Sequence, residues 1–292
     1  CGNSWLAKTY GRYGLFVVSV TYLPIPTQRV YVRILRYITT TGTNGNSVSN
    51  PTGIAIDIGN TRCKLLYDGT LYIVDYSDDW ATHVLEHIQA INVVTTCGIS
   101  SVSAVRSEAL TQLLTDNGIA VITITPGLIQ QHITTSGVIG TGTDRLLGVI
   151  GGINVTQSPL ITVDFGTAVT VNAVDRNNNF LGGTIMPGVR TQLQALHTHT
   201  AQLPLVERSD CPLVLGTTTT HAILAGVVYG VAGAVQNIVA TMQQQNALLQ
   251  HAAIIFCGGD ASFMIDYFPA QFAILRPHLV LEGILRITNT NT

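Results

Sequence analysis

The clearest hydrophobic pattern in this chain is a short apolar run that ends on aspartate and glycine, and it occurs twice. Residues 53–56 lead into Asp57-Ile-Gly-Asn-Thr61, and residues 160–163 lead into Asp164-Phe-Gly-Thr-Ala168. An apolar run of this length before a glycine turn predicts a buried strand. Each strand would present a carboxylate and several backbone N–H groups at its tip. Such a tip suits a metal-bound phosphate, because the amides hold the anion while the carboxylate attracts the cation.

Stretches of helical character follow the strands in both halves of the chain. Helices are predicted over residues 80–89, 102–115, 144–153, 192–197 and 220–242. This order predicts an α/β protein of two domains related by internal duplication, each with a mixed sheet flanked by helices. Two facing aspartate tips would then form a nucleotide cleft between the domains.

The most apolar of these helices contains residues 222–235, which carry no charged side chain. This run is shorter than the roughly 20 residues that cross a bilayer, so a buried core helix is predicted and no membrane span. Gly226, Gly230 and Gly233 would allow a neighbouring helix to approach closely. The sequence leaves open whether that neighbour lies in the same fold or across a subunit interface.

The composition argues against several classes of function. The chain has 292 residues, of which 46% are hydrophobic and 10% charged, and its net charge is −2. One or two domains with a large core are therefore expected, and no basic field indicates a nucleic-acid partner. The five cysteines are scattered without a Cys-x-x-Cys motif, which favours reduced thiols in a cytoplasmic protein over disulfides or a zinc site. His197 and His199 are two residues apart, so they do not share a helical face as metal ligands would.

Residues 1–52 differ from the rest of the chain. Their charged residues are all basic, and residues 39–47 form a polar linker of the Thr/Gly/Asn type. A signal peptide is disfavoured because no small-residue cleavage site follows residues 15–20. The segment is either the remnant of a fused or upstream domain, with a strand over residues 30–38, or a start-site artefact. We expect it to be dispensable.

From residue 53 to about residue 288, the order of motifs resembles type III pantothenate kinase, a family of the actin-like ATPase superfamily. The segments that carry the resemblance are Asp57-Ile-Gly-Asn-Thr-Arg-Cys-Lys64, Gly142-Thr-Asp-Arg145, Asp164-Phe-Gly-Thr-Ala168, Gly182-Gly-Thr-Ile-Met-Pro-Gly188, Thr200-Ala-Gln-Leu-Pro204 and Gly216-Thr-Thr-Thr219. Asp-x-Gly-x-Thr alone marks only the superfamily. The segment at Gly142 between the two aspartate motifs, followed by those at Gly182 and Thr200, is specific to the family.

The resemblance implies two duplicated actin-like ATPase (ribonuclease H-like) domains with mixed sheets, over residues 53–158 and 159–288, and an interdomain nucleotide cleft. It implies ATP-dependent phosphorylation of pantothenate to 4′-phosphopantothenate, the first step of coenzyme A biosynthesis, by a homodimer. Two alternatives stay open. The chain could be a different small-molecule kinase of the superfamily, or a catalytically weak nucleotide-binding accessory or regulatory protein.

Three departures from the family pattern bear on these alternatives. Residues 132–140 lack the aromatic residue and the proline that usually precede the Gly142 segment. Asn172 replaces an aspartate, which we expect to weaken one polar contact. Gln236 stands near a position where many relatives have glutamate.

The resemblance assigns ATP, with Mg²⁺, to the first aspartate motif and to one residue of the second. The implied ATP-binding residues are Asp57, Ile58, Gly59, Asn60, Thr61, Arg62, Cys63, Lys64 and Thr167. Lys64 could instead be a solvated cation of the hairpin. Cys63 would usually point into the core, where its oxidation could disturb ATP binding. Asp164 is the implied ligand of a monovalent cation, K⁺ or NH₄⁺.

The resemblance assigns pantothenate to the segment at Gly142 and to one later threonine. The implied substrate-binding residues are Gly142, Thr143, Asp144, Arg145 and Thr219, with Asp144 as the catalytic general base. Asp144 also suits the first turn of a helix, where acidic side chains are favoured. Thr219 has a rival role as the N-cap of a helix beginning at His221.

Overall fold

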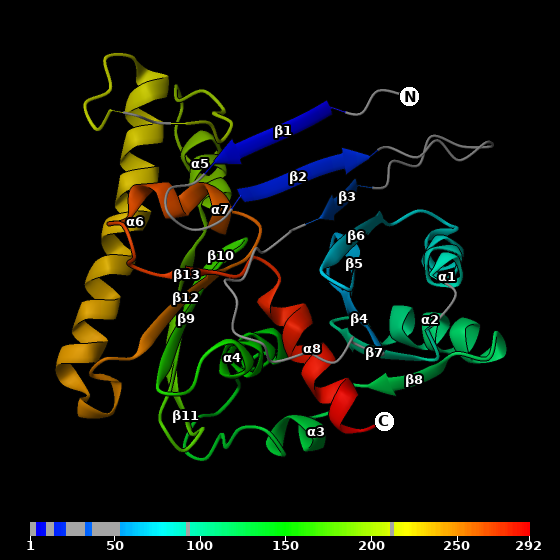
Figure 1. The fold of residues 1–292 in the computed structure, drawn as a ribbon. Coiled ribbons are helices and arrows are strands. Elements are labelled where there is room, and N and C mark those ends of the chain that lie inside the picture. Colours follow the sequence, from blue (N-terminus) through cyan, green and yellow to red (C-terminus); the bar gives the residue numbers. More distant parts are fainter. Residues whose placement is uncertain (1–3, 10–14, 22–32, 37–52, 92–93, 211–212) are drawn as a thin grey trace. The chain divides into compact units, whose positions relative to one another are not determined.

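The computed structural model describes residues 4–9, 15–21, 33–36, 53–91, 94–210 and 213–292 (Figure 1). The chain divides into two compact units, one formed by Cys1–Leu128 with Ile284–Thr292 and the other by Ile129–Gly283. This division differs from the domain boundary predicted between residues 158 and 159, because residues 129–158 belong to the second unit. The polar linker predicted over residues 39–47 lies outside the described residues.

The first unit is built on a mixed sheet with the strand order β1-β2-β3-β6-β5-β4-β7-β8. Its strands are β1 (Ser4–Thr9), β2 (Leu15–Thr21), β3 (Arg33–Arg36), β4 (Gly53–Ile58), β5 (Arg62–Tyr67), β6 (Thr70–Asp75), β7 (Thr96–Ser101) and β8 (Ala120–Thr123). β4, β5 and β6 are antiparallel neighbours, whereas β7 is parallel to β4 and β8 is parallel to β7. β3, which falls within the strand predicted over residues 30–38, pairs antiparallel with β6.

The second unit repeats this arrangement. Its strands are β9 (Leu160–Phe165), β10 (Ala168–Val174), β11 (Phe180–Pro187), β12 (Ala253–Cys257) and β13 (Ile274–Leu275), in the order β11-β10-β9-β12-β13. β9, β10 and β11 are antiparallel neighbours, and β12 and β13 continue the sheet in parallel from β9. Order and direction are those of β6-β5-β4-β7-β8, so the predicted duplication of two mixed sheets is confirmed.

All five predicted helices are present. The helices are α1 (Trp80–Ala90), α2 (Ala104–Asp116), α3 (Pro126–Gln130), α4 (Thr143–Val155), α5 (Val189–Thr198), α6 (Thr219–Gln245), α7 (Ala261–Met264) and α8 (Leu279–Thr290), with 3₁₀ turns at Ala247–Leu249 and Ile265–Tyr267. α2 begins two residues later than predicted because the Ser103 side chain caps it, accepting a hydrogen bond from the Arg106 N–H. α3, α7 and α8 were not predicted.

Both faces of the second sheet are covered. Ile161, Val163 and Phe165 on β9 are buried in a core shared with α5 and α6. The alternate residues Leu160 and Thr162 lie on the face toward α4, where a Cβ on Gly152 would come within 3.3 Å of them. β9 is therefore buried on both faces, as its continuous apolar run predicted.

The first sheet is packed in the same way. Ile54, Ile56 and Ile58 on β4 share a core with α1 and α2. The end of α8 approaches β7 at Gly98, where a Cβ would collide with the side chain of Thr288. Gly98 is therefore required for α8 to lie against this strand.

α6 (27 residues) is long and apolar enough to cross a membrane, but half of its most apolar window is buried within the structure. Val228 and Val235 are completely buried in the core of the second unit. The predicted core helix is thus confirmed for one face of α6. Gly226, Gly230 and Gly233 have no described atom within 4 Å of the place a Cβ would take, so they do not serve close packing inside the described fold.

Candidate functional site

The first aspartate turn follows β4. Asp57 is the next-to-last residue of this strand and has a side chain that is 20% exposed. Lys64 on the neighbouring β5 places its Nζ 3.9 Å from Asp57 Oδ2. The Gly59 N–H donates to the Arg62 carbonyl at 3.2 Å, which closes a tight turn with exposed side chains at positions 60–62. A carboxylate, a lysine and an accessible turn therefore meet at one strand tip, which suits a cation and a phosphate together.

Two residues of the predicted ATP-binding segment have side chains in the core. Ile58 and Cys63 are completely buried. Burial raises the pKa of the Cys63 thiol far above its usual range, with a smaller contribution in the same direction from Asp57. Only the backbone of these two residues is available for a ligand, and a neutral buried thiol is a poor target for oxidation.

The turn at Gly59 is held from behind by an aromatic residue that sequence analysis did not single out. The Tyr76 hydroxyl donates to the Gly59 carbonyl at 2.7 Å. The Tyr76 ring packs edge-on against Trp80 at 5.2 Å, and the Arg106 guanidinium lies 3.9 Å from the ring centroid on one face. Burial raises the pKa of Tyr76 to about 12, so the hydroxyl remains a donor at neutral pH. No sequence motif predicts this contact, because Tyr76 and Gly59 are 17 positions apart and come together only in the folded sheet.

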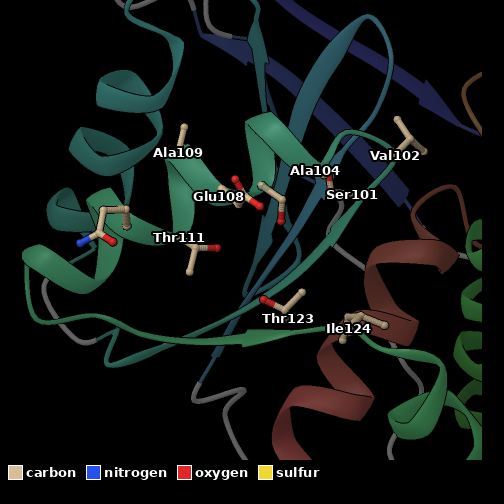
Figure 2. A pocket seen from close by; sticks show the side chains of 10 residues that line it. Ser101, Val102, Ala104, Glu108, Ala109, Thr111, Thr123 and Ile124 are labelled. Carbon is tan, nitrogen blue, oxygen red and sulfur yellow. The ribbon is translucent and has the colours of Figure 1, made fainter.

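The first unit also has a cavity of about 900 Å³ (Figure 2). It is lined by α2 and by the ends of β7 and β8, with hydroxyls from Ser101, Thr111 and Thr123 and the carboxylate of Glu108. The Val102 N–H at its rim donates to the Ile58 carbonyl at 3.1 Å, so the cavity adjoins the residue before Gly59.

The second aspartate turn follows β9. The Gly166 N–H donates to the Ala168 carbonyl at 3.1 Å, and Thr167 is exposed at the tip of the turn. Gly258, after β12, has a φ of 92°, and a Cβ there would collide with the Asp164 carboxylate. Glycine is thus required at position 258 both by its backbone conformation and by its approach to Asp164.

The start of α5 is attached to this second turn. The Thr167 carbonyl accepts from the Gly188 N–H at 2.8 Å and from the Thr191 hydroxyl at 2.7 Å. Gly188 packs against the backbone of Gly166 and Thr167, so a side chain there would not fit. The start of α5 therefore packs directly against the turn that follows Asp164.

α4 carries Asp144 and Arg145 in its first turn. Asp144 is exposed, and a Cβ on Gly142 would lie 2.6 Å from its Oδ1, so the carboxylate is folded back against Gly142. The Arg145 Nε donates to Asn172 Oδ1 at 2.7 Å, and its guanidinium lies 5.8 Å from the Phe180 ring centroid. Arg145 is thus held by the second sheet, while the neighbouring carboxylate is open to a ligand.

Asn172, whose replacement of an aspartate is expected to weaken one polar contact, still holds Arg145 through its amide oxygen. Asn172 is 1% exposed, and its Nδ2 donates to the Thr170 hydroxyl at 3.2 Å, which turns the amide oxygen toward Arg145. Residues 132–140, the other departure from the family pattern, include a short attachment to the hairpin of β10 and β11. The Phe180 N–H donates to the Thr134 carbonyl at 2.8 Å, and Ile139 is 98% exposed.

The start of α6 lies one residue from the predicted position. Thr218 is the N-cap, and its hydroxyl accepts from the His221 N–H at 3.2 Å. The rival role of Thr219 as the cap is therefore wrong, and Thr219 is an exposed residue in the first turn. His197 has a structural contact, with Nδ1 3.0 Å from the Leu203 carbonyl oxygen.

The described residues contain no cluster of three or more histidine, cysteine, aspartate or glutamate side chains that could hold a metal. The second turn offers a different set of donors. Asp164 contributes a carboxylate, Thr167 a hydroxyl, and the backbone its carbonyl groups. Oxygen donors of this kind fit a hard cation such as K⁺ or Mg²⁺.

Comparison with known proteins agrees with this architecture. A profile of the type III pantothenate kinase family matches residues 53–241. A type III pantothenate kinase of Bacillus cytotoxicus is 33% identical over 150 residues, which cover 51% of this chain and 56% of that protein. A Campylobacter jejuni protein assigned to the Baf family of transcriptional activators has a similar fold, with a TM-score of 0.55 at 20% identity over 82% of this chain and 98% of that one. The family match covers more than half of the chain, and the chain therefore belongs to the type III pantothenate kinase family.

Proposed function

We propose that this protein transfers the γ-phosphoryl group of ATP to the 4′-hydroxyl of pantothenate and so forms 4′-phosphopantothenate. Family membership supports the reaction, although the alignment spans 56% of the Bacillus relative's length. The observation that carries the proposal is the first turn of α4. There an exposed carboxylate, Asp144, adjoins an arginine that is fixed by Asn172.

Asp144 acts as the general base. Phosphoryl transfer needs positioning, charge neutralisation and an oriented hydroxyl, and an aspartate that accepts the hydroxyl proton supplies the last of these. Gly142 and Thr143 shape the helix start that presents this carboxylate. Arg145 binds the carboxylate of pantothenate. Because its partner Asn172 is neutral, the hydrogen bond positions the guanidinium without cancelling its charge.

ATP is bound at the two aspartate turns. Asn60 and Thr61 hold phosphate oxygens with backbone N–H groups and a hydroxyl, and Gly59, whose own N–H is bonded to the Arg62 carbonyl, lets a phosphate approach the turn closely. Asp57 would hold Mg²⁺ or its water ligands. Lys64 contacts a phosphate. Its Nζ lies 3.9 Å from Asp57 Oδ2, at the same strand tip as the turn, which supports this role. Thr167 reaches the nucleotide from the second turn, and Thr219 contacts pantothenate.

Asp164 holds a monovalent cation, K⁺ or NH₄⁺, through oxygen donors of the second turn. A cation held here would supply positive charge to offset that of the phosphates. Its position at the end of β9, which corresponds to Asp57 at the end of β4, supports the assignment.

The protein acts as a cytoplasmic homodimer. The glycine-lined face of α6 supports the dimer, because Gly226, Gly230 and Gly233 are exposed with open space above them. The thiols of Cys63, Cys97 and Cys257 are buried and none of them is paired in a disulfide, which fits the proposed reducing compartment.

The test is the substitution Asp144→Asn, assayed for pantothenate-dependent ADP formation. Loss of a general base typically slows turnover by about 10²–10⁴-fold, while ATP binding should persist. Asp116→Asn is a matched control, because it removes an exposed carboxylate at the end of α2. Near-normal turnover in Asp144→Asn would show that this carboxylate stabilises the first turn of α4 and is not the general base. If the wild-type chain binds ATP but never phosphorylates pantothenate, it is an accessory protein or a kinase of another small molecule.

A further inference from the structure

Asp260 is a buried carboxylate that pairs with two arginines through one oxygen. Its side chain is 7% exposed and lies just beyond β12. Arg208 Nη1 is 2.8 Å and Arg190 Nη2 is 3.4 Å from Asp260 Oδ1. One carboxylate cannot neutralise two guanidinium groups. The cluster therefore keeps one excess positive charge.

This cluster is built onto the second aspartate turn from two sides. The Asp260 N–H donates to the Phe165 carbonyl at 2.9 Å. Arg190 lies two residues after Gly188, whose N–H donates to the Thr167 carbonyl at 2.8 Å. The excess charge is thus held close to the residues 164–167, where the oxygen donors for a cation also lie.

The two arginines differ in how firmly they are held. Arg208 makes the shorter ion pair, is 28% exposed, and its guanidinium lies 4.8 Å from the Phe263 ring centroid. Arg190 makes the longer ion pair and is 67% exposed. A buried carboxylate needs a partner, and Arg208 alone provides one. Arg190 can therefore turn to another anion without leaving Asp260 unpaired.

We propose that Arg190 is a further phosphate-binding residue for the nucleotide, and that Asp260 holds it near the second turn until a nucleotide binds. This inference rests on the proposed function, since it assumes that ATP phosphates come to the second turn. A guanidinium suits that role because its N–H groups match phosphate oxygens in pairs. Arg208 keeps Asp260 satisfied when Arg190 leaves it, and so makes Arg190 available.

The experiment measures binding of Mg·ATP, Mg·ADP and adenosine to the full chain by isothermal titration calorimetry. Arg190→Gln should weaken ATP binding about tenfold, weaken ADP binding less, and leave adenosine binding unchanged. Arg190→Lys should recover part of the loss, because it restores the charge without the paired N–H groups. Arg176→Gln is the matched control. It removes an exposed arginine from the turn at the opposite end of the β10–β11 hairpin, and its ATP affinity should equal that of the wild type.

A double-mutant cycle tests the role of Arg208. Arg208→Gln should leave Arg190 as the partner of Asp260 and so weaken ATP binding by a similar factor. In the Arg190→Gln background, Arg208→Gln should have no further effect on ATP affinity, although it lowers the melting temperature in both backgrounds. Wild-type ATP affinity in Arg190→Gln, equal weakening of adenosine, or additive effects in the cycle would each overturn the inference. A wild-type chain that does not bind ATP would overturn the proposed function along with it.

Discussion

Tyr76→Phe separates the positioning of the phosphate turn from the stability of the fold. The substitution removes one hydroxyl, which donates to the Gly59 carbonyl at 2.7 Å. The ring and its contacts with Trp80 and Arg106 are retained. Whatever changes in the variant is therefore due to the hydroxyl, which donates to the Gly59 carbonyl and also interacts with the Arg106 side chain.

The size of the effect follows from the type of bond. A neutral hydrogen bond contributes about 0.5–1.5 kcal/mol net, and we expect the free energy of unfolding to fall by that amount. The turn that loses this support carries the N–H groups proposed to hold phosphate. If the loss is felt fully in ligand binding, ATP affinity falls by up to about tenfold. Because the pKa of Tyr76 is raised to about 12, the effect should not vary between about pH 6 and 9.

The assay combines chemical denaturation with calorimetric titration of ATP. Tyr67→Phe is the control, since Tyr67 ends β5 in the same sheet and is half-buried. A Tyr76→Phe protein that is less stable, as expected, but binds ATP as tightly as the control would refute a role of this hydroxyl in ATP binding. The bond to Gly59 would then support the fold without setting the geometry of the turn.

Four further outcomes are expected. Asp164→Asn should raise the concentrations of K⁺ and ATP needed for half-maximal activity together, whereas equal wild-type rates in sodium-only and potassium buffers would exclude the cation site. Asn172→Asp should pair with Arg145 and weaken pantothenate binding about tenfold, read as a higher KM; an unchanged KM would contradict this role. Burial by itself would raise the pKa of Asp175, but hydrogen bonds from Asn179 and from the N–H of residue 177 lower it overall. That carboxylate therefore stabilises the fold above about pH 4 and loses this effect as the pH falls, so Asp175→Asn should flatten the acid branch of the stability profile measured by denaturation. A chain beginning at Gly53 retains β4 and its core and should be folded and active, with β6 as a new sheet edge that lowers solubility; loss of activity would show that the preceding segment is required.

The repeated strands could be predicted because their signal is local. Each core strand is buried on both faces, so β4 and β9 appear as apolar runs, and each ends at a glycine turn. α8 was not predicted from the sequence. Its existence depends on packing that only the fold reveals, such as the space that Gly98 leaves for Thr288.

The residues that support the site could not be predicted from the sequence either, because their contacts also depend on the fold. Tyr76 and Gly59 are 17 positions apart, and Arg190 and Asp260 are 70 positions apart. No spacing rule joins residues at such distances, since the sheet alone brings them together. The Asp-x-Gly motifs, in contrast, carry their chemistry within a few consecutive residues.

Asn172 shows that a residue's type does not reveal which partner it will have in the fold. From the sequence it was a neutral replacement that should weaken a contact. In the structure its amide oxygen, fixed by Thr170, accepts from the Arg145 Nε 27 positions away. An aspartate there would form an ion pair and cancel the charge of the guanidinium, whereas asparagine orients it and leaves that charge for a ligand. The substitution thus keeps the geometry of Arg145 while changing the electrostatics of the proposed pantothenate site, a distinction that depends on the partner and not on the residue type.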